Sequence, residues 1–415
     1  MENGKWKMKS TEIGPIPEDW EVKRLGKIGE PLMCKRILKS QTLEVGDVPF
    51  FKIGTFGKSA DAFISRQLFE NYKRQYSYPR KGDILISAAG TIGRTVQFDG
   101  QDAYFQDSNI VWIDHDNTVV TNDYLKWYYQ IINWQTENGG TVSRLYNNNL
   151  KGALVAVPPL PEQRKIAAAL SDVDEYIEAI GRLVEKKRAV KQGAMQELLT
   201  GKKRLAGFKG EWVAKKIERI GSFYTGLTGK SGDDFGRGES KYITFLNVLS
   251  NVVIDLTILE QVDVKNGEKQ NSVCKGDVFF NTSSETPEEV GYCSVLNDDV
   301  VDVYLNSFCF GFHITDKNVS GHFLAYWFRT SLGRALMTFL AQGSTRYNLP
   351  KDAFKKTSIV IPSTLVEQNA IIDVLSDMDA EIAALEEKKS KVEAIKAGMM
   401  QELLTGKTRL MEVSK

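Results

Sequence analysis

The sequence is poor in the residues that build covalent and metal-bound centres. It has four cysteines and three histidines in 415 residues. No two cysteines form a CxxC pair, and the histidines are not spaced with them as zinc ligands. We therefore expect reduced thiols and no metal site. The N-terminus has no apolar signal-peptide core, and no apolar run approaches the ~20 residues of a membrane span. These absences predict a cytoplasmic protein.

Motifs of catalysis are also missing. The sequence contains no GxGxxG, no GxxxxGK[ST] phosphate loop and no Asn-Pro-Pro-aromatic tetrapeptide of the kind that amino-methyltransferases use. Three scattered histidines make a Ser/His/Asp arrangement improbable. We expect a protein without catalytic residues and without a cofactor of its own.

Charge is nearly balanced. Lysine and arginine number 54 and aspartate and glutamate 53, so the formal net charge is +1. A chain that wraps DNA is usually strongly basic, and this one is not. Local basic patches remain compatible with a neutral chain, so the balance does not exclude nucleic-acid binding.

What the sequence does have is a long internal repeat. Residues 161–205 and 366–410 align without a gap at a shift of 205 residues and are identical at about half of their positions. Each copy ends in MQELLTGK(K/T)RL. A similar Trp-containing stretch lies at the N-terminus, around Trp20, and after the first copy, around Trp212. The order is therefore cyclic: a Trp-containing start, a variable block and a long repeat, each occurring twice.

Both repeats carry the pattern of a coiled coil. Apolar residues recur in alternating steps of four and three, which makes a narrow stripe on one face of a helix. Gly201 and Gly406 follow as natural helix stops. The seam positions are Ile166, Leu170, Val173, Ile177, Ile180 and Val184 in the first copy, and Ile371, Leu375, Met378, Ile382 and Leu385 in the second.

The two variable blocks differ from the repeats. Short apolar runs bounded by Gly, Asp and Asn predict strands, and each block carries one expected helix, at 121–137 and at 321–342. KGD occurs in both blocks and reads as a turn between strands, capped by Asp83 and Asp277. The segments GGTVSRLYNNNLKG and QGSTRYNLPKDAFKK, which precede the repeats, resemble each other as Gly-Ser/Thr-Arg-Tyr-Asn motifs.

The predicted fold class is α+β, with two α/β domains related by a pseudo-twofold and separated by a long antiparallel two-helix coiled coil. Two helices of equal length and matching pattern most simply pair with each other, although pairing between chains remains open. The expected boundaries are 1–157 for the N-terminal segment and first domain, 158–205 for the first helical spacer, 206–362 for the second domain and 363–415 for the second spacer.

A two-headed object with a rigid spacer suits a target with two separated half-sites, such as DNA. A scaffold that holds two protein ligands apart, with no role in DNA specificity, is the alternative. A self-sufficient DNA methyltransferase is a third possibility, and it lacks a recognisable cofactor site.

The motifs together resemble a known family. TEIGPIPEDWEVKRLG, KGDILISAAGTIG, VPPLPEQRKIA before the long helix, and QELLTGKKRL in two cyclic copies are similar to the specificity subunit of Type I restriction–modification enzymes. The second copy departs from the pattern at IPSTLVEQNA, where Pro362 alone remains of the double proline and Val366 replaces the proline at the helix start.

The resemblance implies a recognition protein within a larger complex. Each variable block would be a target recognition domain that reads half of a bipartite, asymmetric double-stranded DNA site. The helices would set the spacer between the halves and dock two adenine methyltransferase (modification) subunits, and through them restriction/translocase subunits. S-adenosylmethionine, ATP and magnesium are then expected on those partners, with none in this chain.

Candidate DNA-reading residues are Arg or Lys for guanine, Asn or Gln for adenine, and hydroxyls, placed on loops or strand ends. Each has the alternative of being a solvated loop residue, and the acidic SSETPEEVG segment would repel phosphate. The candidates in the first block are Thr55, Lys58, Lys73, Arg74, Thr91, Arg94, Ser143, Arg144 and Asn147. Those in the second block are Arg237, Lys241, Asn247, Ser283, Ser284, Thr286, Ser344, Arg346 and Asn348.

Overall fold

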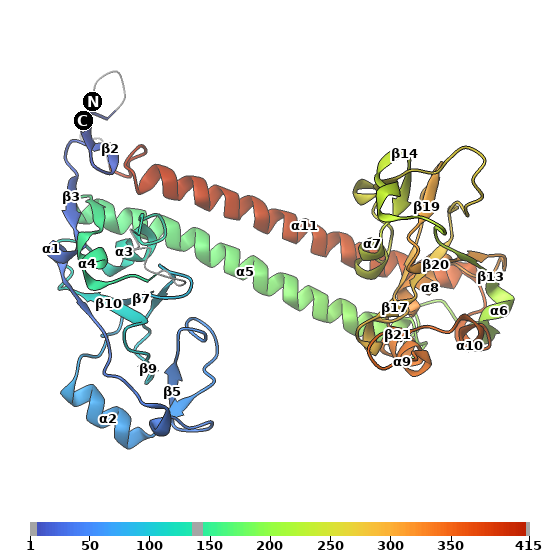
Figure 1. Cartoon of the computed structure of the whole chain (residues 1–415), viewed down its shortest axis with the longest axis horizontal. Coiled ribbons are helices and arrows are strands. Elements are labelled where there is room, and N and C mark those ends of the chain that lie inside the picture. Colours follow the sequence, from blue (N-terminus) through green and yellow to red (C-terminus); the bar gives the residue numbers. More distant parts are fainter. Residues whose placement is uncertain (1–5, 135–143, 412–415) are drawn as a thin grey trace. The chain divides into compact units, whose positions relative to one another are not determined.

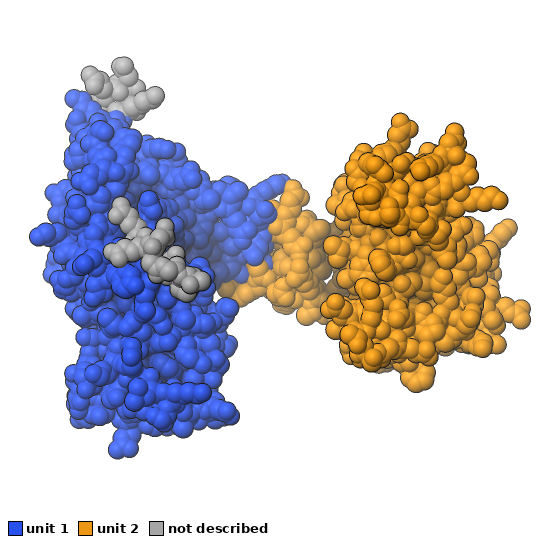
Figure 2. All heavy atoms as spheres, in the orientation of Figure 1, with its two compact units in different colours: residues 1–180, 388–415 blue, residues 181–387 orange. Residues whose placement is uncertain are grey.

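The computed structural model describes residues 6–134 and 144–411 (Figure 1). The chain divides into two compact units, which Figure 2 colours separately: unit 1 comprises residues 1–180 and 388–415, and unit 2 comprises residues 181–387. Each unit contains one variable block and part of both long helices, α5 (Leu160–Leu198) and α11 (Leu365–Leu403). Among the described residues, no helix combines the length and apolarity needed to cross a bilayer.

Unit 1 is built from short strands and helices around two apolar clusters. Its strands are β1 (Met8–Thr11), β2 (Gly14–Pro17), β3 (Glu21–Arg24), β4 (Glu30–Leu32), β5 (Val48–Phe51), β6 (Phe63–Ile64), β7 (Ile84–Ser87), β8 (Thr95–Gln97), β9 (Tyr104–Phe105), β10 (Ile110–Asp114) and β11 (Leu154–Val157). Its helices besides the long pair are α1 (Leu25–Ile28), η1 (Lys39–Gln41), α2 (Arg66–Gln75), α3 (Asn122–Tyr128) and α4 (Asn147–Gly152).

Unit 2 has its own apolar clusters, the larger of which includes residues of the long helices. Its strands are β12 (Trp212–Lys216), β13 (Gly221–Thr225), β14 (Phe235–Ile243), β15 (Glu260–Val262), β16 (Val278–Asn281), β17 (Ser283–Ser284), β18 (Cys293–Val295), β19 (Val303–Leu305), β20 (Cys309–Ile314), β21 (Tyr347–Asn348) and β22 (Ser358–Pro362). Its shorter helices are α6 (Ile217–Ile220), η2 (Gly232–Asp234), α7 (Phe245–Ser250), η3 (Leu256–Ile258), η4 (Pro287–Glu289), α8 (Gly321–Trp327), α9 (Ser331–Leu340) and α10 (Lys351–Lys355).

The two units share one sheet topology. An antiparallel four-stranded sheet runs β4-β10-β7-β8 in unit 1 and β13-β20-β16-β18 in unit 2. A three-stranded sheet runs β6-β5-β9 and β15-β14-β19, and in both cases its last pair is parallel. The final strand before each long helix pairs with the strand that carries or follows the motif tryptophan, as β11-β3 and β22-β12. The repeat seen in the sequence is therefore a repeat of fold.

The KGD segments are turns, as predicted. Gly82 and Gly276 have φ of +95° and +86°, a region that glycine enters without steric cost. Asp83 accepts the backbone N–H of Arg80 at 2.7 Å, and Asp277 accepts that of Cys274 at 3.0 Å. Each carboxylate thus closes the turn that leads into the central strand of its sheet.

The long helices pair antiparallel within each unit, and the predicted stripe is their buried face. Eight of the eleven seam positions are buried, and Val173, Met378 and Leu385 are half-buried. In unit 1 Asp174 pairs with Lys396 at 2.5 Å, and in unit 2 Asp379 pairs with Lys191. The sequence repeat relates these two pairs, because a shift of 205 residues carries Asp174 onto Asp379 and Lys191 onto Lys396.

A buried carboxylate holds the start of each long helix. In unit 1 Glu162 accepts hydrogen bonds from Arg409 Nε at 2.5 Å and from Trp20 Nε1 at 3.0 Å. These contacts close the cyclic order of motifs, since Arg409 lies in the last repeat and Trp20 in the N-terminal segment. The glycine stop completes the joint: Gly406 has φ +71°, and a Cβ there would lie 2.4 Å from Cδ of Pro17.

Unit 2 contains the same joint. Glu367 accepts hydrogen bonds from Arg204 Nε at 2.5 Å and from Trp212 Nε1 at 3.3 Å. Gly201 also has φ +71°, with Trp212 beside the place of its missing Cβ. The replacement of proline by Val366 leaves the helix start in register, since α5 and α11 begin 205 residues apart.

Both helices predicted in the variable blocks were too long. The described part of the segment 121–137 is helical only over α3, and it then turns so that the Trp134 ring lies against Gly93, where a Cβ would be 2.4 Å from the indole nitrogen. The segment 321–342 is two helices, α8 and α9. The break falls at Thr330, whose hydroxyl accepts the N–H of Gly333 at 3.1 Å and so caps a new helix.

Candidate nucleic-acid interface

Three chain segments meet at the end of the central strand of unit 1. They are the loop after β7, the loop before β10 and the segment before α4. The N–H of Leu145 donates to Ala88 O at 2.9 Å, and the N–H of Ala88 donates to Asn109 O at 2.8 Å. Because the hydrogen bonds join backbone to backbone, the fold fixes the meeting point and leaves its side chains free to vary.

Unit 2 repeats this meeting point with different side chains. The N–H of Leu349 donates to Thr282 O at 2.9 Å, and the N–H of Thr282 donates to Phe308 O at 2.9 Å. The loops after β7 and β16 are each tied back by a buried polar side chain. Ser87 Oγ accepts the N–H of Arg94 at 2.9 Å, and Asn281 Oδ1 accepts that of Tyr292 at 2.6 Å.

The backbone pairing corrects the motif alignment made from the sequence. Arg144 bridges Ala89, whereas Asn348 pairs with Ser283. Arg144 is therefore equivalent to Asn348, and the alignment of the Gly-Ser/Thr-Arg-Tyr-Asn letters was wrong by two residues. Arg346 lies two residues before Asn348, in the bend that leads into β21.

A basic cleft opens beside the meeting point in unit 1. Its volume is about 520 Å³. Four cationic and several amide or hydroxyl side chains line it, with one carboxylate. The polar lining residues are Arg36, Lys39, Thr42, Lys52, Gln106, Asp107, Ser108, Asn109 and Arg144.

The cations of this cleft are only partly neutralised. Arg36 pairs with Asp107 at 2.8 Å and Lys52 with Asp61 at 2.8 Å. Within the described ranges, Lys39 has no ion-pair partner, and the cleft retains a positive surplus. A cleft of this kind favours a negatively charged ligand such as a phosphate.

Arg144 is oriented by neutral oxygens. Its Nη2 donates to Ser108 O at 3.1 Å and to Asn109 Oδ1 at 3.1 Å. Ser108 has φ +60°, an uncommon value for a residue other than glycine, so local strain presents that carbonyl. No carboxylate among the described residues pairs with Arg144, so its charge is not neutralised by an ion pair there.

Several other candidates in the first block have structural roles. Thr55 Oγ1 accepts the N–H of Lys52 at 3.1 Å and closes a turn. Lys73 lies 3.4 Å from Asp102 and against the Phe69 and Tyr78 rings. Arg94 Nη1 donates to Phe56 O at 3.0 Å.

The remaining first-block candidates lie mostly on the surface. Lys58, Arg74, Thr91 and Asn147 are exposed, and Ser143 lies outside the described residues.

In the second block Asn247 is a correction. Its side chain is fully buried, its Nδ2 donates to Asp255 O at 2.8 Å, and its Oδ1 accepts from Asp255 N at 3.1 Å and from Asn251 Nδ2 at 2.9 Å. It closes an internal turn and is not available to DNA. The sequence placed it in an apolar strand run, YITFLNVL, whereas the structure makes it part of helix α7.

The acidic loop of the second block is internally bonded. Ser283 is buried in β17, and Ser284 Oγ donates to Glu289 Oε2 at 2.8 Å. Thr286 is exposed there, while Ser344, Arg346 and Asn348 are exposed on the segment before α10.

Arg237 and Lys241 lie on β14, which carries an irregularity. Both Phe235 and Ser240 pair with Val262, so the residues between them bulge out of the sheet. Gly236 and Gly238 flank Arg237 with φ of +76° and +91°, which allows the chain to turn out and back.

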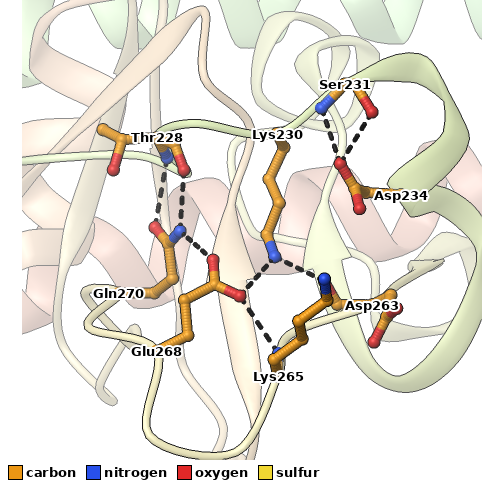
Figure 3. Close-up of polar contacts among 8 residues, drawn as sticks. All are labelled: Thr228, Lys230, Ser231, Asp234, Asp263, Lys265, Glu268 and Gln270. Carbon is orange, nitrogen blue, oxygen red and sulfur yellow. Dashed lines mark hydrogen bonds and ion pairs between the residues drawn. The ribbon is translucent and has the colours of Figure 1, made fainter.

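An ion pair between Lys230 and Glu268, here called the lysine–glutamate clamp, joins two loops of unit 2 (Figure 3). Lys230 Nζ donates to Glu268 Oε2 at 2.6 Å and to Asp263 O at 2.5 Å, and its side chain is 5% exposed. The hydrogen bond from Lys230, with others from Gln270 and Lys265, lowers the pKa of Glu268 from 4.5 to about 2. The clamp ties the loop after β13 to the loop after β15.

Residues that the sequence did not single out complete both sites. Asn109 and Phe308 occupy equivalent positions, and Arg36 and Lys39 line the cleft. The sequence could not indicate these four residues, because each lies in a variable loop that contains no recognisable motif. By contrast, Glu162 and Arg409 lie in EQ and RL motifs that occur in both repeats, and this identity is a signal from which they could have been found. Among the described residues, no cluster of His, Cys, Asp and Glu could hold a metal ion.

Comparison with known proteins identifies the family. A family model described as the Type I restriction modification DNA specificity domain matches residues 17–186 and 209–394. A putative type I restriction enzyme specificity subunit of Haemophilus influenzae, S.HindORF215P, is 57% identical over 165 residues. That alignment spans 40% of this chain and 43% of the relative.

Other relatives match over nearly their whole length. The putative MjaX specificity subunit of Methanocaldococcus jannaschii is 24% identical over 97% of this chain and 96% of its own. The fold resembles the S subunit of M. genitalium, with a TM-score of 0.55, 13% identity and coverage of 92% and 96%. It also resembles a chain from a study of type I R-M complex assembly and conformational transition, with a TM-score of 0.58, 16% identity and coverage of 95% and 99%.

The named relatives are specificity subunits, as the sequence motifs imply for this chain. The family match covers both units and leaves out only the termini and the stretch between the two domains. The chain therefore belongs to the Type I restriction–modification DNA specificity family and contains two of its DNA specificity domains.

Proposed function

We propose that each unit reads one half of a bipartite, asymmetric site in double-stranded DNA. The observation that carries the proposal is the repeated meeting point of three loops. Its backbone frame is the same in both units, while its side chains differ: Arg144 and Asn109 in unit 1 occupy the positions of Asn348 and Phe308 in unit 2. One frame with two sets of polar and aromatic groups suits two different base sequences.

The paired helices are proposed to set the spacer and to dock partner subunits. The repeat-related ion pairs Asp174–Lys396 and Asp379–Lys191 give both units the same helix register, which supports two equivalent docking surfaces. Two adenine methyltransferase subunits would bind there, and restriction/translocase subunits would bind through them. These partners would carry S-adenosylmethionine, ATP and magnesium, and the target adenine would be flipped into a methyltransferase pocket. The complex would act in the cytoplasm.

A scaffold for two protein ligands remains the second possibility. The basic surplus of the cleft in unit 1 favours DNA over that reading, because a protein ligand gives no general reason for an arginine left without a carboxylate.

Co-expression tests the proposal. We expect the chain to co-purify with an adenine methyltransferase subunit of the same cell, and adenine methylation of DNA to require both proteins. A methyltransferase that neither binds the chain nor needs it for site choice would contradict the proposal. Crosslinking with S-adenosylmethionine is expected to label the methyltransferase and not this chain.

A further inference from the structure

A tight hairpin in unit 2 presents Arg346. Gln342 and Asn348 exchange two backbone hydrogen bonds of 2.9 and 2.8 Å, and Asn348 also pairs with Ser283 across β17 and β21 (Figure 1). Gly343 closes the hairpin with φ +147°, and a Cβ there would lie 2.0 Å from Arg346 O. The backbone around Arg346 is therefore fixed by pairing on both sides.

The guanidinium of Arg346 lies over the exposed aromatic ring of Phe308. Arg346 Cζ lies 5.6 Å from the centroid of the Phe308 ring, and Phe308 is 51% exposed. Phe308 itself is held by its backbone: its N–H donates to Asn306 Oδ1 at 2.8 Å, and its carbonyl accepts from both N and Oγ1 of Thr282. The fold thus keeps a large apolar ring at the surface, with the Arg346 guanidinium over its face.

The arrangement leaves the hydrogen-bonding edges of Arg346 free. Among the described residues, no side chain or carbonyl accepts a hydrogen bond from the guanidinium, and no carboxylate pairs with it. Contact with the face of a ring keeps the in-plane N–H groups available, which include the parallel pair of a bidentate contact. Arg144 differs, because its Nη2 is already bonded to two oxygens.

We propose that Arg346, held on Phe308, reads a guanine in the half-site of unit 2. Guanine presents O6 and N7 in the major groove, and a bidentate arginine matches that pair. A phosphate is the weaker fit here, because β21 pairs with β17, which leads directly into a loop bearing Glu285, Glu288 and Glu289. Carboxylates repel phosphate but can accept a hydrogen bond from the N4 amine of the paired cytosine.

This inference rests on the proposed function. Mapping of methylated adenines in cells tests both, because failure of the inference and failure of the proposed function give different motifs. The complex is expressed with the wild-type chain, R346Q, R346K or F308A. We expect R346Q to relax one guanine position in one half-site, with preference for guanine reduced by on the order of 10- to 100-fold. The other half and the gap should stay unchanged. R346K should relax the same position because lysine lacks the fork, and F308A should relax it partly.

The control is R219Q, which removes an exposed arginine of α6 in the same unit and should leave the motif unchanged. An unchanged motif in R346Q would overturn the inference. So would uniformly weaker methylation of the same motif, which is the result for a phosphate contact, and so would loss of all methylation in R346Q with a normal motif in R346K. Absence of a bipartite motif in the wild type would instead refute the proposed function.

Discussion

At the residue scale, two buried carboxylates make equivalent hydrogen bonds in the two units. Glu162 and Glu367 each sit at the start of a long helix and accept hydrogen bonds from one arginine and one tryptophan. Burial of a charged pair adds little net stability when the pair is complete, but removing one partner strands the other. Each joint is therefore stable only while both partners are present, and we expect mutation of either partner to destabilise the fold.

Removal of Arg409 should destabilise unit 1. The variant R409A leaves Glu162, whose side chain is 0% exposed, without its ionic partner, so we expect a loss of roughly 3–5 kcal/mol in the free energy of unfolding. Urea unfolding followed by tryptophan fluorescence measures it. The exposed neighbour Lys407 supplies the control, K407A, for which we expect no more than about 0.5 kcal/mol. A loss of less than about 1 kcal/mol in R409A would contradict the role given to the joint.

The clamp between Lys230 and Glu268 should depend on pH. Because the folded-state pKa of Glu268 is about 2, below its ordinary 4.5, the clamp stabilises the fold fully above pH 4.5. That stabilisation is lost as pH falls from 4.5 toward 2. The difference in Tm between wild type and E268Q should be constant near neutral pH and shrink over that acidic window. A difference that does not change with pH would refute this account.

At the element scale, the four-three spacing of apolar residues identified the long helices, and Gly201 and Gly406 indicated where they end. The seam positions predicted from the four-three spacing face the partner helix, because only that stripe is continuous enough to bury. Helices of the variable blocks were predicted less well. Aromatics at helical spacing did not reveal the breaks after Tyr128 and at Thr330, since tertiary contacts of Trp134 and a hydroxyl cap decide them.

Lengthening the helices should change the spacer of the DNA site. Four residues add about 6 Å to a helix, which is one to two base-pair steps. Insertions after Ile180 in α5 and after Glu387 in α11 fall at the boundary of the two units, so the contacts inside each unit are kept. We expect a longer gap and unchanged half-sites by methylation mapping. An insertion in α5 alone is the control, and it should destabilise the helix pair. Altered half-sites with an unchanged gap would contradict the prediction.

At the scale of the whole molecule, a nearly neutral chain agrees with the proposal that the methyltransferase subunits supply much of the contact to the DNA backbone, a division of labour between subunits. The 54 lysines and arginines are almost balanced by 53 carboxylates, and four of the cations of unit 1 line one cleft. The family and the fold class were both predictable from repeated motifs. The candidate reading residues were predictable only in outline: Arg346 is exposed and Arg144 half-buried, so both remain predictions, whereas Asn247 is internal. The candidate residues lie in loops, where no periodicity in the sequence indicates which way a side chain points.

The isolated chain should bind DNA weakly. Because its positive and negative charges nearly balance, we expect poor discrimination between specific and random duplexes in moderate salt, and tight binding once the methyltransferase subunits are added. Fluorescence anisotropy with labelled duplexes measures both states across a salt series. Tight and specific binding by the chain alone would contradict the division of labour.

The central claim is that two units of one fold read two halves of one site. Single-molecule sequencing of DNA from cells that carry this chain and its methyltransferase maps every methylated adenine and tests the claim most directly. The account predicts one bipartite, asymmetric motif with a gap of fixed length, which disappears when this chain is deleted. A continuous motif, a gap of variable length, or methylation that persists without the chain would contradict it.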